Sequence, residues 1–351
     1  MITIGRKTFK LVITSPELIE KINPENKRLV DRFFKNYRTK RSAKSADSYK
    51  SNYNIFFVWN LLYNNNKFFV DIKKLEMMDF FDFGSANLKW SPNRYSQVWS
   101  SLSVLSDFVE NMMDEIYPQF RNIVKKIDKP VKEPVRKKSI FTQAEMDSLM
   151  NWLDENNKVQ QKCLLALILS SGARISELNR FDINIIDLNN IAFYGLFLET
   201  TDDMQVKGRG VNGKRIIRYI IKDIFVSHYL NWLPLREEIM KKNNQEHNCL
   251  FIKSDGTPAI NATLRSWMEK WDKFLDKPWY PHAGRHYWCS YLSAIGLESD
   301  LIQELQNWQS QDMVILYNDN TAKDKKWKGL DKLKEHLNKE PILIENDKVG
   351  E

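Results

Sequence analysis

The chain has 351 residues, of which 42% are hydrophobic and 28% charged, so it has enough apolar side chains for about two packed domains and is not an intrinsically disordered chain. Its net charge of +8 favours a polyanionic partner, although a merely basic soluble protein would carry the same charge. The three cysteines, Cys163, Cys249 and Cys289, are scattered and odd in number, which argues against a disulfide framework and offers no metal-ligand spacing.

The beginning of the chain, residues 1–23, is short and basic and has no apolar stretch of the length found in signal peptides. We predict an N-terminal arm or a loose terminus here. No apolar run in the sequence approaches the roughly 18 residues that cross a membrane. We therefore expect a cytoplasmic protein with no membrane partner.

Residues 24–126 carry apolar side chains at helical spacing and are predicted to form a helical domain. Further along this domain, helices are predicted at about residues 72–81 and from Ser91 to about Met112, where a proline follows the serine as it often does at a helix start. The clearest helix covers Ser48–Leu62, because its aromatic residues recur at i, i+4, i+7 and i+8 and share one face. These aromatic residues are Tyr49, Tyr53, Phe56 and Phe57.

Residues 127–139 are rich in lysine and arginine, and Pro130 and Pro134 prevent a continuous helix there. We predict a basic, extended linker between two domains. The linker is either a solvated tether or a strap that lies against phosphate groups.

Residues 140–322 are predicted to form a second domain, in which Thr142 and Glu145 have the spacing of a helix capping box. Strand-like segments at residues 183–206 and 215–221 flank a glycine-rich turn. The predicted fold class is therefore mostly α with a small antiparallel β-sheet (α+β). Its helices are predicted at about residues 142–155, 158–171, 223–243, 260–275, 284–296 and 299–307.

Three segments of this domain carry residues that suggest chemistry. Arg174 precedes Glu177 by three, His282 precedes Arg285 by three, and Trp308 precedes Tyr317 by nine. Each pair alone has an ordinary structural explanation: an ion pair on a helix, a helix entry and packed aromatic side chains. Their occurrence together, in this order, is much more specific than any one of them.

Together the three segments resemble the two signature boxes of the tyrosine recombinase (phage integrase) family, over about residues 140–322. The first arginine of that family lies in a Gly-x-Arg-x-Ser-Glu-Leu context, as Arg174 does, and the second lies in His-x-x-Arg-His, as Arg285 does. A His or Trp precedes the family's nucleophilic tyrosine by nine, as Trp308 precedes Tyr317. The preceding helical domain has a weaker resemblance to the core-binding domain of the family.

One departure from the family pattern lies just before Trp308. The family's usual Leu-Gly-His reads Gln306-Asn307-Trp308 in this chain. The family accepts tryptophan at the last of these positions, so the departure leaves the resemblance in place.

The resemblance implies an enzyme that cuts and rejoins DNA strands without metal, ATP or another cofactor. Tyr317 would attack a phosphodiester and form a 3′-phosphotyrosyl bond. Arg174 and Arg285 would grip the non-bridging oxygens of the phosphate. His282 would accept the tyrosine proton or donate a hydrogen bond to the phosphate, and Trp308 would bind the phosphate through its indole N–H.

A general acid and two supporting residues complete this interpretation. The family uses a hairpin lysine as general acid, for which Lys207 is the first choice and Lys214 the second, with Arg209 also aligning plausibly. Alternatively, all three merely contact backbone phosphates. Glu177 would orient Arg174 or His286, and His286 would support the site without reacting.

The resemblance also implies that the two domains clamp duplex DNA and that protomers associate into a dimer or tetramer on it, and it allows for an accessory directionality factor. In this clamp Tyr49 would lie near a groove of the DNA. A solvated charged face is the alternative for the basic residues of the first domain and linker. The predicted DNA-binding residues are Lys40, Arg41, Lys44, Lys50 and Lys137.

Residues 323–351 are predicted to contain a tail helix, because Leu330, Leu333 and Leu337 form one apolar stripe. The stripe is buried either on a neighbouring protomer, as often in the resembled family, or on the chain's own catalytic domain.

The function predicted from the resemblance is site-specific DNA recombination of the integrase or transposase kind. The protein would act for a mobile genetic element and would be associated with the nucleoid. A dimer resolvase or an invertase would share the mechanism and differ in its DNA substrate. A type IB topoisomerase uses related chemistry without a partner protomer. A non-catalytic DNA-binding regulator that retains the fold would have no need of the full set of site residues.

Overall fold

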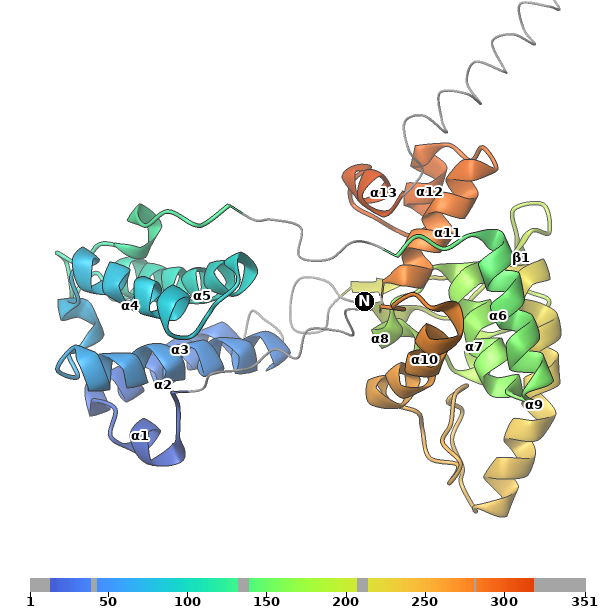
Figure 1. Ribbon diagram of the computed structural model, residues 1–351, viewed down its shortest axis with the longest axis horizontal. Coiled ribbons are helices and arrows are strands. Elements are labelled where there is room, and N and C mark those ends of the chain that lie inside the picture. Colours follow the sequence, from blue (N-terminus) through green and yellow to red (C-terminus); the bar gives the residue numbers. More distant parts are fainter. Residues whose placement is uncertain (1–12, 39–42, 132–138, 207–213, 281, 319–351) are drawn as a thin grey trace, which may run out of the picture. The chain divides into compact units, whose positions relative to one another are not determined.

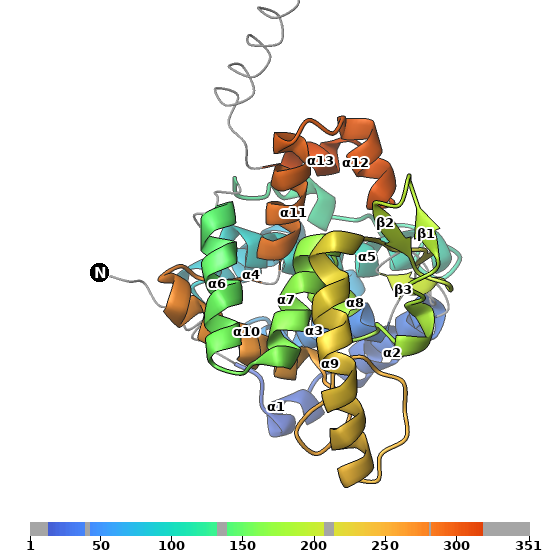
Figure 2. The ribbon, with the colours of Figure 1, turned by 90° about the vertical axis from the view of Figure 1, so that its right-hand side faces the viewer.

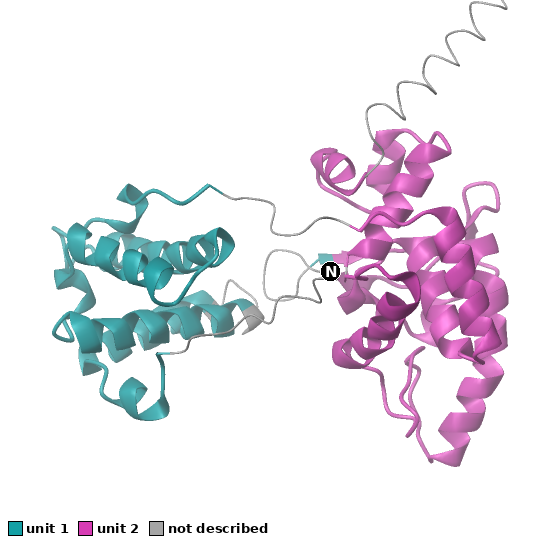
Figure 3. Cartoon of the chain, viewed as in Figure 1, with its two compact units in different colours: residues 1–137, 207–214 teal, residues 138–206, 215–351 magenta. Residues whose placement is uncertain are grey.

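The computed structural model describes residues 13–38, 43–131, 139–206, 214–280 and 282–318. The chain divides into two compact units, residues 1–137 with 207–214 and residues 138–206 with 215–351 (Figure 3). Each unit has its own hydrophobic core. Among the described residues, no helix is long and apolar enough to cross a membrane.

The elements that residues 13–131 of the first unit form are all helices (Figure 1). Ser15 and Ser91 accept hydrogen bonds from backbone N–H groups of the helices that follow them, and a proline opens each of these helices. Ile22 is buried in the core, so the end of the predicted N-terminal arm is packed against this unit. The elements are α1 (Pro16–Glu20), α2 (Pro24–Arg38), α3 (Ala43–Tyr63), α4 (Lys74–Ala86) and α5 (Pro92–Met112), with short 3-10 helices η1 (Phe69–Asp71) and η2 (Val124–Lys126).

The core of the first unit is built largely from aromatic rings. The ring centroids of Phe56 and Phe80 are 4.9 Å apart, and those of Phe33 and Tyr53 are 5.6 Å apart. The buried Tyr53 hydroxyl donates to the backbone carbonyl of Ser101 at 2.9 Å, so its polar end is satisfied. The aromatic face predicted from the sequence of α3 therefore lies at the centre of this core.

The first residues of the predicted linker pack on helix α5. The Trp99 indole N–H donates to the carbonyl of Ile127 at 2.8 Å, and the Lys129 ammonium lies 3.6 Å from the centroid of the Trp99 ring. A cation over an indole face is attracted by the ring quadrupole. Residues 127–129 are thus attached to the first unit, and residues 132–138 lie outside the described residues.

The second unit is organised around helix α7, whose residues from Cys163 to Ser171 are all buried (Figure 2). A helix that is apolar on every side must be covered on every side. Helices α6, α9 and α11 pack against α7, and Figure 2 shows it between α6 and α9. The helices are α6 (Gln143–Glu155), α7 (Val159–Ser171), α8 (Ile175–Leu178), η3 (Ile183–Ile185), α9 (Lys222–Lys242), α10 (Asn261–Leu275), α11 (Ala283–Ala294), α12 (Ser299–Leu305) and α13 (Asp312–Tyr317).

The strands of the second unit are short and belong to two sheets. Antiparallel strands β1 (Ile191–Ala192), β2 (Phe197–Glu199) and β5 (Tyr219–Ile221) pair in the order β1-β2-β5, with Leu198 opposite Ile220. Strands β3 (Met204–Val206) and β4 (Lys214–Ile216) form the second sheet. The predicted fold class, mostly helical with a small antiparallel sheet, is confirmed.

The predicted strand segments were too long. Residues 183–185 form the 3-10 helix η3, because the Asp182 carboxylate accepts a hydrogen bond from the Asn184 N–H at 2.8 Å. The segment 215–221 is split between β4 and β5 at Arg218. There the Arg218 N–H donates to the Thr200 hydroxyl and the Thr200 N–H donates to the Arg218 carbonyl, both at 3.0 Å. The Arg218 side chain is buried in the interior at this break.

Candidate active site

The turn between α7 and α8 is the base of the site. Gly172 ends α7 in the left-handed region with φ +57°, and a Cβ atom there would lie 2.6 Å from the Gln306 amide nitrogen. The Gly172 carbonyl accepts a hydrogen bond from Arg285 Nη1 at 3.0 Å. The tight turn therefore brings Arg174, the first residue before α8, beside the arginine of α11.

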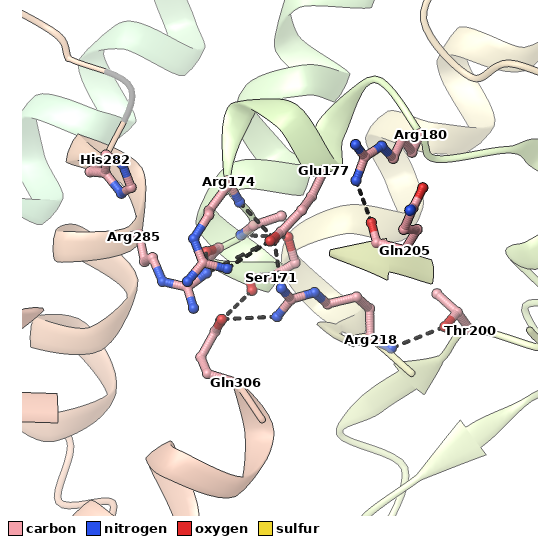
Figure 4. A network of polar contacts seen from close by, with 12 residues as sticks. Ser171, Arg174, Glu177, Arg180, Thr200, Gln205, Arg218, His282, Arg285 and Gln306 are labelled. Atoms are coloured by element: carbon pink, nitrogen blue, oxygen red, sulfur yellow. Dashed lines mark hydrogen bonds and ion pairs between the residues drawn. The ribbon is translucent and has the colours of Figure 1, made fainter. Parts of the chain in front are cut away.

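Glu177 is fully buried and gathers arginine side chains around its carboxylate (Figure 4). Arg174 contributes its Nη1 at 2.7 Å and its backbone N–H at 2.9 Å, and Arg218 contributes Nη2 at 2.6 Å. Arg285 Nη1 lies 4.0 Å away. Burial by itself would raise the pKa of Glu177, but the charges of Arg218 and Arg174 outweigh burial and lower the pKa, so the carboxylate stays ionised.

Arg285 and Trp308 present buried donors that lack acceptors. Arg285 is 1% exposed, and its Nε and Nη2 atoms have no hydrogen-bond partner among the described residues. The same holds for the indole N–H of Trp308, whose ring centroid lies 4.8 Å from the Arg285 guanidinium. Leaving such donors buried and unsatisfied costs about 1–3 kcal/mol each. Their arrangement is suited to an anion with several acceptor oxygens, such as a phosphate diester.

The charge of Arg285 persists at neutral pH. Burial, followed by the nearby charges of Arg174 and Arg218, lowers the pKa of Arg285 to about 9. The guanidinium therefore remains protonated when an anion approaches.

Tyr317 ends helix α13 within reach of a base. Its hydroxyl lies 3.2 Å from His282 Nδ1, and its ring stacks on Trp308 with centroids 5.3 Å apart and an interplanar angle of 16°. The ring of His286 lies 4.8 Å from that of Tyr317. Partial burial and the charges of Arg174 and Arg285 lower the pKa of His282, so its imidazole is neutral at pH 7 and can accept a proton.

Sequence reasoning missed the roles of Arg218 and Gln306. Arg218 donates to the Gln306 side-chain carbonyl at 2.9 Å, and the Gln306 amide donates to the backbone carbonyl of Ser171 at 2.6 Å. The available signal was the arginine itself: a charged residue amid the isoleucines of residues 216–221 is unusual unless it has a buried partner. The departure at Gln306 was recognised in the sequence, but its partner was not.

The structure brings together seven of the predicted site residues and leaves others outside the described ranges. Lys207, Lys40, Arg41 and Lys137 lie outside the described residues, as does Arg209, and the side chain of Lys44 is not described. Lys214 is half-buried on β4, Lys50 is exposed on α3, and Tyr49 is half-buried with its ring 5.2 Å from that of Tyr37. The residues brought together are Arg174, Glu177, His282, Arg285, His286, Trp308 and Tyr317. No group of His, Cys, Asp and Glu side chains in the described part of the chain is arranged to hold a metal ion.

Comparison with known proteins places the second unit among DNA recombinases. The model of the phage integrase family matches residues 139–324. The tyrosine recombinase XerC of Shewanella sp. (strain ANA-3) is 24% identical over 198 residues, which cover 54% of this chain and 59% of that protein. XerC of Thermodesulfovibrio yellowstonii is 28% identical over 162 residues, 45% of this chain and 49% of that protein. The chain thus matches about half to three fifths of the length of these relatives.

Solved structures extend the similarity to most of the chain. The Tn1549 transposon integrase, in complex with transposon right end DNA, superposes with a TM-score of 0.60 at 14% identity, covering 88% of this chain and 99% of that one. The XerH site-specific recombinase, bound to a palindromic difH substrate, gives a TM-score of 0.58 at 14% identity and covers 81% of this chain and 78% of that one. These two structures have the same fold as this chain. With the family model matching more than half of the residues, the chain belongs to the phage integrase family, the tyrosine recombinases.

Proposed function

We propose that this chain is a site-specific DNA recombinase of the integrase or transposase kind. The single observation that carries the proposal is the arrangement at Tyr317. Its hydroxyl faces the neutral His282, while buried donors of Arg285 and Trp308 lie without acceptors beside its ring. A nucleophile, a proton acceptor and a set of donors for a phosphate are therefore assembled in one place.

In the proposed reaction, Tyr317 Oη attacks a DNA phosphorus atom and its proton passes to His282 Nδ1. The new bond joins phosphorus to the tyrosine oxygen, and the bond from phosphorus to the 5′-oxygen breaks. Lys207 is proposed to protonate that leaving oxygen. The resulting 3′-phosphotyrosyl bond retains the energy of the phosphodiester, so a 5′-hydroxyl from another strand can reverse the reaction without ATP.

The arginines stabilise the charge that develops in this reaction. Arg174 and Arg285 are proposed to bind the two non-bridging oxygens, with Glu177 fixing the orientation of Arg174 through two hydrogen bonds. Donors that are already oriented do not have to reorganise when the transition state forms, and this is often the largest contribution to catalysis. Trp308 would add its indole N–H and pack against the nucleophile, and His286 would support the tyrosine ring.

Duplex DNA is the proposed substrate, and self-association on DNA is proposed with it. The related solved structures include XerH bound to difH and a lambda integrase dimer bound to a COC′ core site. We propose that residues 24–126 form the core-binding domain, residues 127–139 the linker and residues 140–322 the catalytic domain. The tail, residues 323–351, lies outside the described residues. We propose that its predicted helix packs either in a neighbouring protomer or on its own catalytic domain. A directionality factor and a location in the cytoplasm near the nucleoid are also proposed.

A nicked DNA duplex that loses a short 5′-terminal fragment after cleavage tests the proposal. We expect a covalent complex of protein and DNA that survives denaturation, because the departed fragment cannot reverse the reaction. The DNA must contain the target site, which is found by selecting bound sequences from a random library. Specific binding without any covalent complex would favour the alternative of a non-catalytic regulator. Resolvase and invertase activities are then distinguished by the arrangement of target sites on the DNA that the protein recombines. Topoisomerase activity is recognised by relaxation of supercoiled DNA.

The general acid can be identified through its leaving group. Lys207→Ala is expected to slow cleavage by about 10²–10⁴-fold, the usual contribution of a positioned acid. A substrate with sulfur in place of the 5′-bridging oxygen should restore the rate, because a thiolate leaves without a proton. Lys214→Ala, at the start of β4, is the matched variant. If the sulfur substrate instead rescues Lys214→Ala, Lys214 is the general acid.

A further inference from the structure

Arg218 is a fully buried arginine whose side-chain hydrogen bonds go to Glu177 and Gln306 rather than to the residues proposed to hold the phosphate. It is 1% exposed and lies between β4 and β5, on the far side of Glu177 from Arg174 (Figure 4). Its two terminal nitrogens donate to different elements, Nη2 to Glu177 of α8 and Nη1 to Gln306 after α12. Arg218 thus connects the small sheets, helix α8 and the segment that leads to Trp308.

The connections of Gln306 extend this bridge. Its amide donates to the Ser171 carbonyl, next to Gly172, whose own carbonyl holds Arg285. Trp308 follows Gln306 by two residues. The same Glu177 oxygen, Oε2, accepts from both Arg218 and the backbone N–H of Arg174, so a rotation of Glu177 would displace Arg174.

The energetics of the buried ion pair between Arg218 and Glu177 favour a positioning role over a stabilising one. A buried ion pair costs several kcal/mol of desolvation per ion, and apolar residues of similar size are often equally stable in its place. Arg218 also leaves its Nε atom without a partner among the described residues. A polar pair that contributes little net stability but joins Glu177 to Gln306 and the Ser171 carbonyl is well suited to fixing geometry.

We infer that Arg218 and Gln306 are a pair of positioning residues that couple the orientation of Glu177, and through it Arg174, to the placement of Trp308 and Tyr317. This inference rests on the proposed function, because it concerns the same phosphoryl-transfer site. Neither residue binds the DNA phosphate. Their effect is to fix the position of the arginines of the site relative to the nucleophile.

Arg218→Met is the first variant for the test, and Arg236→Met is its matched control. Arg236 is also a buried arginine of the same unit and donates to the carbonyls of Cys249 and His247 at 2.8 and 2.6 Å, but neither of these hydrogen bonds reaches the site. Arg218→Met is expected to slow single-turnover cleavage at saturating protein by about 10- to 100-fold, since a misplacement of about 1 Å can have this effect. Its DNA affinity should stay within about threefold, because phosphate contacts dominate affinity.

A double-mutant cycle tests the pairing itself. Gln306→Leu should lose less activity than Arg218→Met, and the variant with both changes should lose no more than Arg218→Met alone. Independent contributions would multiply instead. The pairing is overturned if the losses multiply, and the positioning role is overturned if Arg218→Met cleaves within about twofold of the wild type or if Arg236→Met is equally slow.

The wild-type protein separates this inference from the proposed function. If the wild type forms no covalent complex with the nicked duplex, the proposed function fails. If it does form one, only the variants bear on Arg218 and Gln306. If Arg218→Met fails to fold, Gln306→Leu becomes the deciding variant. It introduces the leucine that is usual in the family at this position and removes the hydrogen bonds of Gln306 to Arg218 and to the Ser171 carbonyl. A wild-type rate for that variant would then refute the inference.

Discussion

Replacing Tyr317 by phenylalanine is expected to abolish covalent capture of nicked DNA while DNA binding stays unchanged. The change removes one hydroxyl and keeps the ring, so the stacking on Trp308 and the contact with His286 persist. Loss of a nucleophile that acts together with a base typically lowers the rate by about 10⁴-fold or more. The covalent complex is measured by its slower migration in a denaturing gel, and binding is measured by fluorescence anisotropy.

Tyr291→Phe provides the matched control for this variant. Tyr291 lies on α11, where its ring stacks on that of Tyr287 with centroids 5.9 Å apart, and it makes none of the contacts described for Tyr317. The control should capture DNA as well as the wild type. A covalent complex that persists in Tyr317→Phe would exclude Tyr317 as the nucleophile and direct attention to Tyr287 or Tyr291.

Replacing Arg285 by alanine is expected to lower the cleavage rate by about 10³-fold or more, and Arg174→Ala should have an effect of the same order. Arg285 offers two buried nitrogens to the phosphate and carries a full charge at neutral pH. Arg285→Lys should recover only part of the rate, because an ammonium group lacks the planar fork of donors. Rates are measured in single turnover on the nicked duplex.

Thermal stability is expected to change little in Arg285→Ala. The side chain makes one hydrogen bond to a backbone carbonyl and lies near the like charges of Arg174 and Arg218. Arg236→Ala should show the opposite behaviour, a lower melting temperature with an unchanged cleavage rate. A reduction of less than about tenfold for Arg285→Ala would mean that Arg285 does not contact the transition state.

The sequence predicted the helices and the local part of the site well, for physical reasons that can be named. The aromatic residues of α3 recur at helical spacing, and burial of that face follows from periodicity alone. Arg174 and Glu177 are three residues apart, so their contact across one helical turn was predictable from spacing.

The remaining part of the site depends on contacts between distant residues. Arg218 and Gln306 are 88 positions apart, and nothing in the spacing of either indicates the other. The strands of two or three residues were predicted too long, because a run of β-branched residues indicates strand conformation but not where pairing partners end. The two hydrogen bonds between Thr200 and Arg218 set that limit.

The crowding of Arg174, Arg218 and Arg285 around Glu177 has a thermodynamic consequence for the folded protein. Three guanidinium groups face one carboxylate, which leaves two positive charges in excess within a largely buried space. The native state without DNA therefore contains an unrelieved repulsion that the unfolded chain does not. An anion that binds only the native state relieves the repulsion and shifts the unfolding equilibrium by mass action. Folding of the second unit and occupation of its site by a phosphate are consequently linked equilibria, in which each promotes the other.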